Sequence, residues 1–178
     1  MFTQYIKNLI KKRSLLLKIA EANYLILKGY HPIFLDYPVN PIPRYGYEKP
    51  PHSKLYEIID RNRMRYKNNL ERFLEFEEYF WRIHLGKPIT IQEPYWMNKW
   101  ITGLDAVALY SFLCLNNPKM YFEIGSGEST KFARKAIRDH NLQTKIISID
   151  PHPREEIDSI CDVVIRHPVE EVDLHIFD

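Results

Sequence analysis

The residues best suited to chemistry lie in one turn and at the end of the strand that follows it. Gly125 and Gly127 let the chain bend sharply and leave the backbone open to a ligand. The apolar segments 120–124 and 145–149 predict two strands buried on both faces of a parallel sheet, and Asp150 follows the second strand. The carboxyl ends of neighbouring parallel strands meet at one edge, where ligands bind. Asp150 is then placed to accept hydrogen bonds from ribose hydroxyls, so the pattern predicts an adenosine-containing cofactor.

The turn suits S-adenosylmethionine better than a dinucleotide or a nucleoside triphosphate. The dinucleotide fingerprint G-x-G-x-x-G has a third glycine where this chain has Thr130, and the turn lacks the G-x-x-x-x-G-K sequence of a P-loop. Glu123 lies inside the first strand, where burial of a carboxylate is costly unless the group is paired. The ammonium of S-adenosylmethionine would pair it, and so would Lys119, Lys131 or a backbone amide.

The helix after the turn completes the predicted site. Ser129 or Thr130 is expected to cap this helix, and the same uncapped amides can bind a carboxylate. Its apolar stripe comprises Phe132, Ala133, Ala136 and Ile137. The residues expected to hold the cofactor are Glu123, Gly125, Ser126, Gly127, Ser129, Thr130 and Asp150.

These motifs resemble those of class I S-adenosylmethionine-dependent methyltransferases. The nearest likeness is to a bacterial group whose first motif reads E-I-G-S-G-x-S-T, as residues 123–130 do here. The segments 148–154 and 98–106 also resemble that group. The resemblance implies a Rossmann-like α/β sheet, a cofactor cradle around Glu123 and the two glycines, and ribose binding by Asp150.

The segment before the first strand has two interpretations. The resemblance implies that Asn98, Trp100 and Asp105 approach the cofactor. However, Thr102 and Asp105 fit a capping box at the start of a helix that runs to about residue 115, and burial of an aromatic ring would explain Trp100. We favour the structural roles for Asp105 and Trp100.

The activity that the resemblance implies is methyl transfer from S-adenosylmethionine to an acceptor. The acceptor that we predict is an oxygen of a small metabolite or sugar. The histidines have no spacing typical of a metal site or a Ser-His-Asp set, so we name no catalytic base and no metal. Two alternatives stay open: an NAD- or nucleotide-binding Rossmann enzyme, and a non-catalytic interaction module.

Composition narrows the class of protein further. The net charge of +2, spread along the chain, argues against nucleic acid as the main partner. No apolar run approaches the roughly 18 residues of a membrane span, so stable membrane insertion is not expected. Cys114 and Cys161 lie in apolar surroundings and are expected to be reduced thiols in a cytoplasmic protein.

Helix patterns and prolines predict two regions. Residues 1–86 form a helical extension, with helices over 2–28 and 55–83 joined by the proline-rich connection 31–53. Residues 87–178 form the Rossmann-like region, with a loop and short strand over 87–95, a short helix near 155–160 and a third strand at 163–165.

The predicted sheet stops after its third strand. A class I methyltransferase resembles a seven-stranded sheet, so the chain corresponds to the N-terminal half of that fold. Half a sheet exposes an apolar strand edge, which is an aggregation hazard unless it is covered. The chain is a fragment, or another copy completes the sheet as a homo-oligomer, or the N-terminal helices cover the edge. We favour the fragment, and expect this chain to bind the cofactor weakly or not at all.

Overall fold

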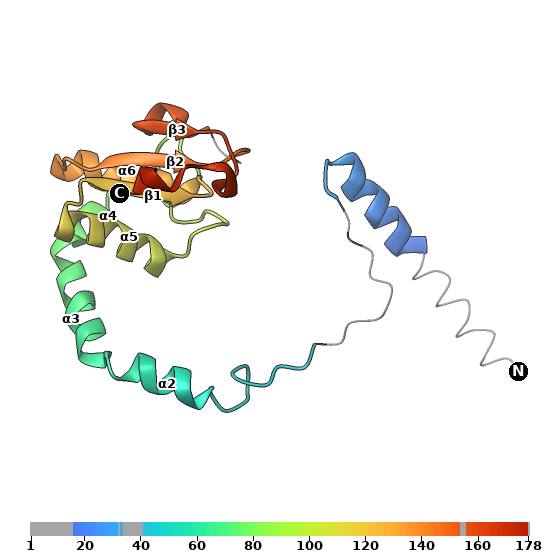
Figure 1. The fold of residues 1–178 in the computed structure, drawn as a ribbon, viewed down its shortest axis with the longest axis horizontal. Helices are drawn as coiled ribbons and strands as arrows, with labels where there is room; N and C mark the ends of the chain where they lie inside the picture. The colour runs from blue at the N-terminus through green and yellow to red at the C-terminus, as the bar shows by residue number, and fades with distance from the viewer. Residues whose placement is uncertain (1–15, 32, 34–40, 154–155, 178) are drawn as a thin grey trace, which may run out of the picture. The chain divides into compact units, whose positions relative to one another are not determined.

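The computed structural model describes residues 16–31, 33, 41–153 and 156–177. The chain divides into two units, residues 1–53 and 54–178, earlier than the boundary expected after residue 86. In the first unit, residues 16–27 form a helix and residues 44–49 form turns and bends (Figure 1). The earlier part of the helix predicted over 2–28 lies outside the described residues.

A three-stranded parallel sheet forms the centre of the second unit (Figure 1). Its strands are β1 (Met120–Ile124), β2 (Lys145–Ile149) and β3 (Val163–Ile165), in the order β1-β2-β3. Phe122 lies opposite Ile147, and Ile147 lies opposite Val163. All three strands were predicted, and the α/β class with a small parallel sheet is confirmed.

Burial differs between the two strands that lead into the predicted site. β2 is the central strand, and its residues from Ile146 to Ile149 are buried. β1 lies at an edge, with Met120 43% and Ile124 61% exposed. The prediction that both faces of β1 are buried was therefore wrong. Among the described residues, β1 has a neighbouring strand on one side only, and its apolar composition does not reveal this.

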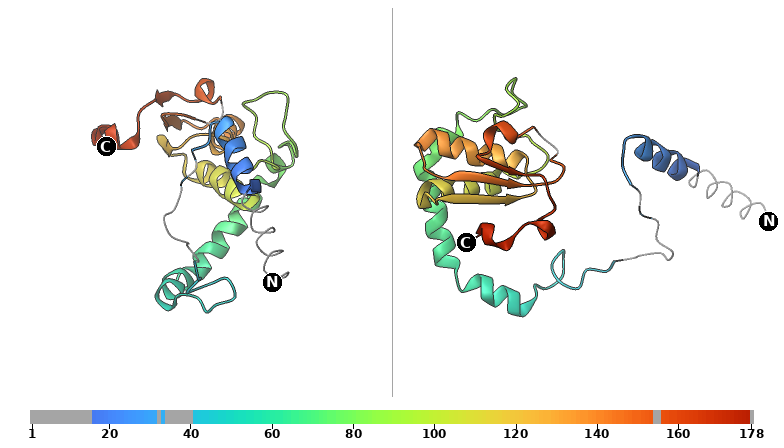
Figure 2. Two further views of the ribbon diagram at one scale, coloured as in Figure 1. Left: turned by 90° about the vertical axis from the view of Figure 1, so that its right-hand side faces the viewer. Right: turned by 45° about the horizontal axis from the view of Figure 1, so that its top comes forward.

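Two helices cover the same face of the sheet, α5 (Gly103–Asn116) and α6 (Glu128–His140) (Figure 2). The apolar stripe predicted for α6 is buried. Asn117 and Asn141 end the helices in left-handed conformations, which asparagine tolerates better than most residues. The shared core consists of Phe76, Tyr110, Leu113, Ala133, Ala136, Ile137 and Ile146.

The single helix predicted over 55–83 was wrong. The segment forms α2 (Ser53–Asp60), α3 (Arg63–Phe73), the 3-10 turn η1 (Leu74–Phe76) and α4 (Glu77–Phe80). Asn62 has φ −100° and ψ 12°, outside the helical region, and its side-chain amide donates to the carbonyl of Ile58. Such a side-chain bond competes with the helical ladder and ends α2.

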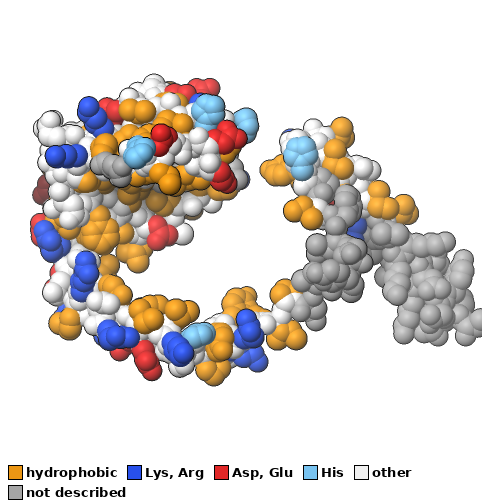
Figure 3. Space-filling view, in the orientation of Figure 1, with side chains coloured by type: hydrophobic (Ala, Val, Ile, Leu, Met, Phe, Trp, Pro, Cys, Tyr) orange, Lys and Arg blue, Asp and Glu red, His pale blue; other side chains and the backbone are white. Residues whose placement is uncertain are grey.

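The expected buried face of this segment is also largely absent. No residue of α2 is buried, and Leu70 on α3 is 48% exposed. Hydrophobic side chains accordingly lie at the surface of this segment (Figure 3). Only its C-terminal part reaches the core, through Phe73 and Phe76.

The remaining elements are short. The helix predicted near 155–160 is a 3-10 turn, η2 (Asp158–Ile160), with residues 154–155 outside the described part, and the strand expected in 87–95 is one bridge between His84 and Tyr95. The turns η3 (Val169–Glu171) and η4 (Leu174–Phe177) follow β3. Phe177 packs against Phe122 with the ring centroids 5.0 Å apart, so η4 covers part of the sheet. Across the described ranges, no helix has the length and apolarity to cross a bilayer.

Candidate functional site

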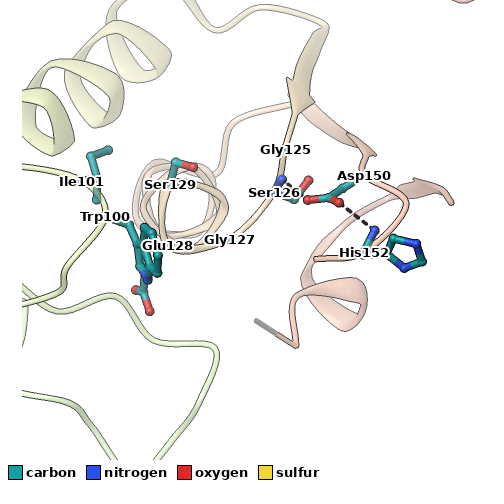
Figure 4. A pocket seen from close by; sticks show the side chains of 9 residues that line it. All are labelled: Trp100, Ile101, Gly125, Ser126, Gly127, Glu128, Ser129, Asp150 and His152. Carbon is teal, nitrogen blue, oxygen red and sulfur yellow. Dashed lines mark hydrogen bonds between the residues drawn. The ribbon is translucent and has the colours of Figure 1, made fainter. Parts of the chain in front are cut away.

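A cavity of about 400 Å³ opens where β1 and β2 end (Figure 4). Five of its lining residues were predicted from the sequence, and Glu123 and Thr130 are not among those that line it. Trp100, Ile101, Glu128 and His152 were not in the predicted set. The lining residues are Trp100, Ile101, Gly125, Ser126, Gly127, Glu128, Ser129, Asp150 and His152.

The glycine turn forms one wall of the cavity. Gly125 has φ +81°, a left-handed conformation that favours glycine, and its N–H donates to the carbonyl of Ile149 at 3.0 Å. A Cβ added at Gly125 or Gly127 would meet no heavy atom within 4 Å. The space beside the turn is therefore open to a ligand.

Asp150 joins the turn to the end of β2. Its Oδ2 accepts the Ser126 N–H at 2.8 Å, and its Oδ1 accepts the His152 N–H at 2.9 Å (Figure 4). Each carboxylate oxygen offers about two acceptor positions, so both can still accept a hydroxyl hydrogen. Arg166, which follows β3, donates to the Asp150 carbonyl at 2.9 Å, a contact the sequence gave no reason to expect.

Glu123 lies behind the turn, buried among hydroxyl groups. Its Oε1 accepts from Ser129 and, at 3.3 Å, from Tyr121, and its Oε2 accepts from Thr130. Burial raises the pKa of Glu123, although the three hydroxyl bonds oppose this shift. Neither lysine proposed as a partner, nor a backbone amide, satisfies the carboxylate; the hydroxyls do.

The start of α6 differs in detail from the expectation. Gly127 is the N-cap, so Ser129 and Thr130 lie in the first turn and do not precede it. Thr130 Oγ1 accepts the Gly127 N–H at 2.9 Å and donates to Glu123. Thr130 therefore satisfies one N-terminal amide, as the third helical residue of a capping box does.

The loop before α5 brings Trp100 to the cavity. Asn98 Oδ1 accepts the N–H groups of Trp100 at 3.0 Å and Ile101 at 2.8 Å, which holds both residues in place. Trp100 is 61% exposed, so the interpretation of a buried ring was wrong. Thr102 donates to Asp105 at 2.5 Å, and neither side chain bonds to an amide of α5, so the capping box was also wrong.

The other titratable candidates are structural or lie away from the cavity. His140 Nε2 lies 3.1 Å from the Tyr110 hydroxyl, and burial lowers the pKa of His140. Both cysteines are free thiols, and burial raises the pKa of Cys114 to about 12 and of Cys161 to about 11. In the part of the chain that the structure describes, no group of three or more His, Cys, Asp or Glu residues is arranged to hold a metal ion.

The charge of the cavity is set by two carboxylates. Glu128 and Asp150 line it, and no lysine or arginine does among the described residues. Lys131 is the neighbouring cation, but its Nζ lies 2.9 Å from Glu128 Oε1 and its side chain is only 1% exposed. The site is therefore better suited to a cationic or hydroxyl-rich ligand than to an anionic one.

Comparison with protein-family models, curated proteins and solved structures finds no match to this chain. The fold and the site define an α/β protein with a cavity at the carboxyl edge of a parallel sheet.

Proposed function

We propose that this chain binds S-adenosylmethionine in the cavity at the end of β1 and β2, as part of a Rossmann-like class I methyltransferase. The observation that carries the proposal is the bond between Asp150 and the Ser126 amide, 2.8 Å long. It joins the strand-end carboxylate and the glycine turn in one cavity wall. A ribose on Asp150 and a chain laid along the bare turn would use both features.

The charges of the cavity favour this cofactor over NAD or a nucleotide. A pyrophosphate would lie at the start of α6, where Glu128 contributes a carboxylate. S-adenosylmethionine carries a sulfonium and an ammonium in place of the pyrophosphate. Thr130 adds a second argument, because it is fully buried behind the turn and its side chain is committed to Gly127 and Glu123.

The residues of this chain would bind and orient the reactants. S-adenosylmethionine supplies an electrophilic methyl group, so the protein's task is in-line positioning of the acceptor and exclusion of water. We propose an oxygen of a small metabolite or sugar as the nucleophile. His152 is the imidazole among the cavity-lining residues, and its backbone N–H is fixed by Asp150; we assign it no proton-transfer role.

The test is an NMR titration of the ¹⁵N-labelled chain with S-adenosylhomocysteine, which detects binding even at millimolar affinity. We expect saturable shifts confined to the amides of residues 125–129 and 150–152. Asp150→Asn should weaken binding by at least about tenfold, because hydrogen bonds to a charged acceptor contribute roughly 1.5–3 kcal/mol.

Asp173→Asn is a matched control for this substitution. Asp173 Oδ1 accepts the N–H of His175 at 3.0 Å, the same two-residue bond that Asp150 makes to His152. Asp173 does not line the cavity. Its variant should bind as the wild type does. Saturable binding of NAD in place of S-adenosylhomocysteine would support the dinucleotide alternative. A folded chain that binds neither would refute cofactor binding by this chain, and self-association of that folded chain would support the interaction module.

A further inference from the structure

Glu128 is the one cavity-lining carboxylate with an unsatisfied oxygen among the described residues. Its side chain is 1% exposed, and Oε1 pairs with Lys131 Nζ at 2.9 Å. Oε2 is buried and has no hydrogen-bond partner. A buried carboxylate oxygen without a partner is costly, so its presence in a cavity wall indicates a donor supplied by a ligand.

The position of Glu128 restricts which part of a ligand it meets. It is the first residue of α6, directly after the glycine turn. In Figure 4 its side chain lies on the opposite side of the turn from Asp150 and His152. A ligand with a ribose at Asp150 would therefore extend its other end toward Glu128.

The neighbouring wall also favours a cation. Trp100 lines the same cavity, and an aromatic face attracts a positive charge. Lys131 does not compete for this role, because it already pairs with Oε1 of the same carboxylate.

We propose that Glu128 Oε2 accepts a hydrogen bond from the α-ammonium group at the aminobutyrate end of the cofactor. This contact determines specificity for adenosine thioethers that carry an amine. This inference rests on the proposed function, since it assigns one end of the same ligand. It differs from the role expected for Glu123, whose carboxylate is satisfied by protein hydroxyls.

The experiment compares three ligands by NMR titration of the full chain. S-adenosylhomocysteine has both the ammonium and the carboxylate, its decarboxylated amine keeps only the ammonium, and 5′-methylthioadenosine lacks both. Glu128→Gln should weaken binding of the two amines by about 10- to 100-fold, as expected for loss of a charged hydrogen-bond partner. Affinity for 5′-methylthioadenosine should stay within about twofold, which also shows that the variant is folded.

A second variant guards against a folding defect from breaking the Glu128–Lys131 ion pair. The double variant Glu128→Gln with Lys131→Met removes both charges, and replacement of a whole buried pair is often tolerated. It should show the same selective loss. Equal affinity of wild type and both variants for the amines would overturn the role of Glu128 while leaving the cofactor site intact. An equal loss for all three ligands would overturn it as well. Failure of the wild type to bind any of the three would instead overturn the proposed function, and with it this inference.

Discussion

Thr130 links the glycine turn, which lines the cavity, to the buried carboxylate of Glu123 behind it. Its hydroxyl accepts the Gly127 N–H at 2.9 Å and donates to the buried carboxylate of Glu123. Thr130→Val keeps the branched shape and removes both bonds. Loss of the bond to the carboxylate should cost about 1.5–3 kcal/mol, and the partly buried amide adds about 1 kcal/mol. We expect a total of about 2–4 kcal/mol in the free energy of unfolding.

Thr130→Ser is the matched control, because it keeps the hydroxyl and removes only a methyl group. Loss of one buried methyl group should cost about 1 kcal/mol. Urea denaturation followed by tryptophan fluorescence measures both variants. Trp81, Trp96 and Trp100 all belong to the unit of residues 54–178, so the signal reports the unit that contains the site.

The relative stability of the two variants shows whether the hydroxyl or the methyl group of Thr130 matters more. If the serine variant is less stable than the valine variant, packing of the methyl group matters more than the hydroxyl network. A valine variant within about 0.5 kcal/mol of the wild type would likewise refute the reasoning. Equal m values are needed for the comparison, since a change in m signals a change in the surface exposed on unfolding.

Three further predictions concern the same unit. Gly125→Ala should lose about 1–2 kcal/mol because φ is +81°, whereas Gly127→Ala, at φ 169°, should stay within about 0.5 kcal/mol of wild type in the same urea assay. Phe132→Ala should lose about 3–5 kcal/mol, since its side chain is fully buried. Folding raises the pKa of Glu123 above its ordinary value of 4.5, so the folded chain binds this proton more tightly and loses stability as pH rises through that value and up to the raised pKa. Glu123→Gln should lack this decline, which urea titrations of both proteins across that pH range would measure.

Each of these predictions has a distinct contrary outcome. Equal destabilisation by the two glycine variants would show that the left-handed backbone at Gly125 is not the cause. A small loss for Phe132→Ala would mean that the cluster it forms with Ile83 and Ala106 closes over the missing ring. Parallel pH curves for wild type and Glu123→Gln would show that Glu123 has the same pKa in the folded and unfolded chain.

The strands and the helix around the site were predictable because short stretches of sequence determine them. The segments 120–124, 145–149 and 163–165 are apolar runs between turn residues, and each is a strand. The stripe of α6 repeats at helical spacing, and it is buried as expected. The proximity of Asp150 to the glycine turn also followed, because parallel strands end at the same edge.

The prediction of one long helix over 55–83 was wrong because helix length there depends on packing and not on local sequence alone. A periodic apolar pattern does not reveal whether another surface is present to bury it, and the apolar residues of α2 have none. Without such packing, the side chain of Asn62 and the local backbone end the helix. Trp100 was misassigned similarly: Asn98 holds the backbone of Trp100 in the loop, and its side chain is 61% exposed rather than packed in a core.

The local elements and the turn that brings Gly125, Gly127 and Asp150 to one edge can be read from the sequence, because they depend on short-range spacing and on the polarity of parallel strands. Packing of the whole chain was needed to show which acid besides Asp150 lines the cavity. Glu123 was the carboxylate the motif emphasised, but three hydroxyls from β1 and the first turn of α6 enclose it. Glu128 is an unremarked residue in the sequence, and the fold leaves one of its oxygens buried and unpaired in the cavity wall. Burial and the partners of a charge are properties of packing, and no spacing of residues along the chain encodes them.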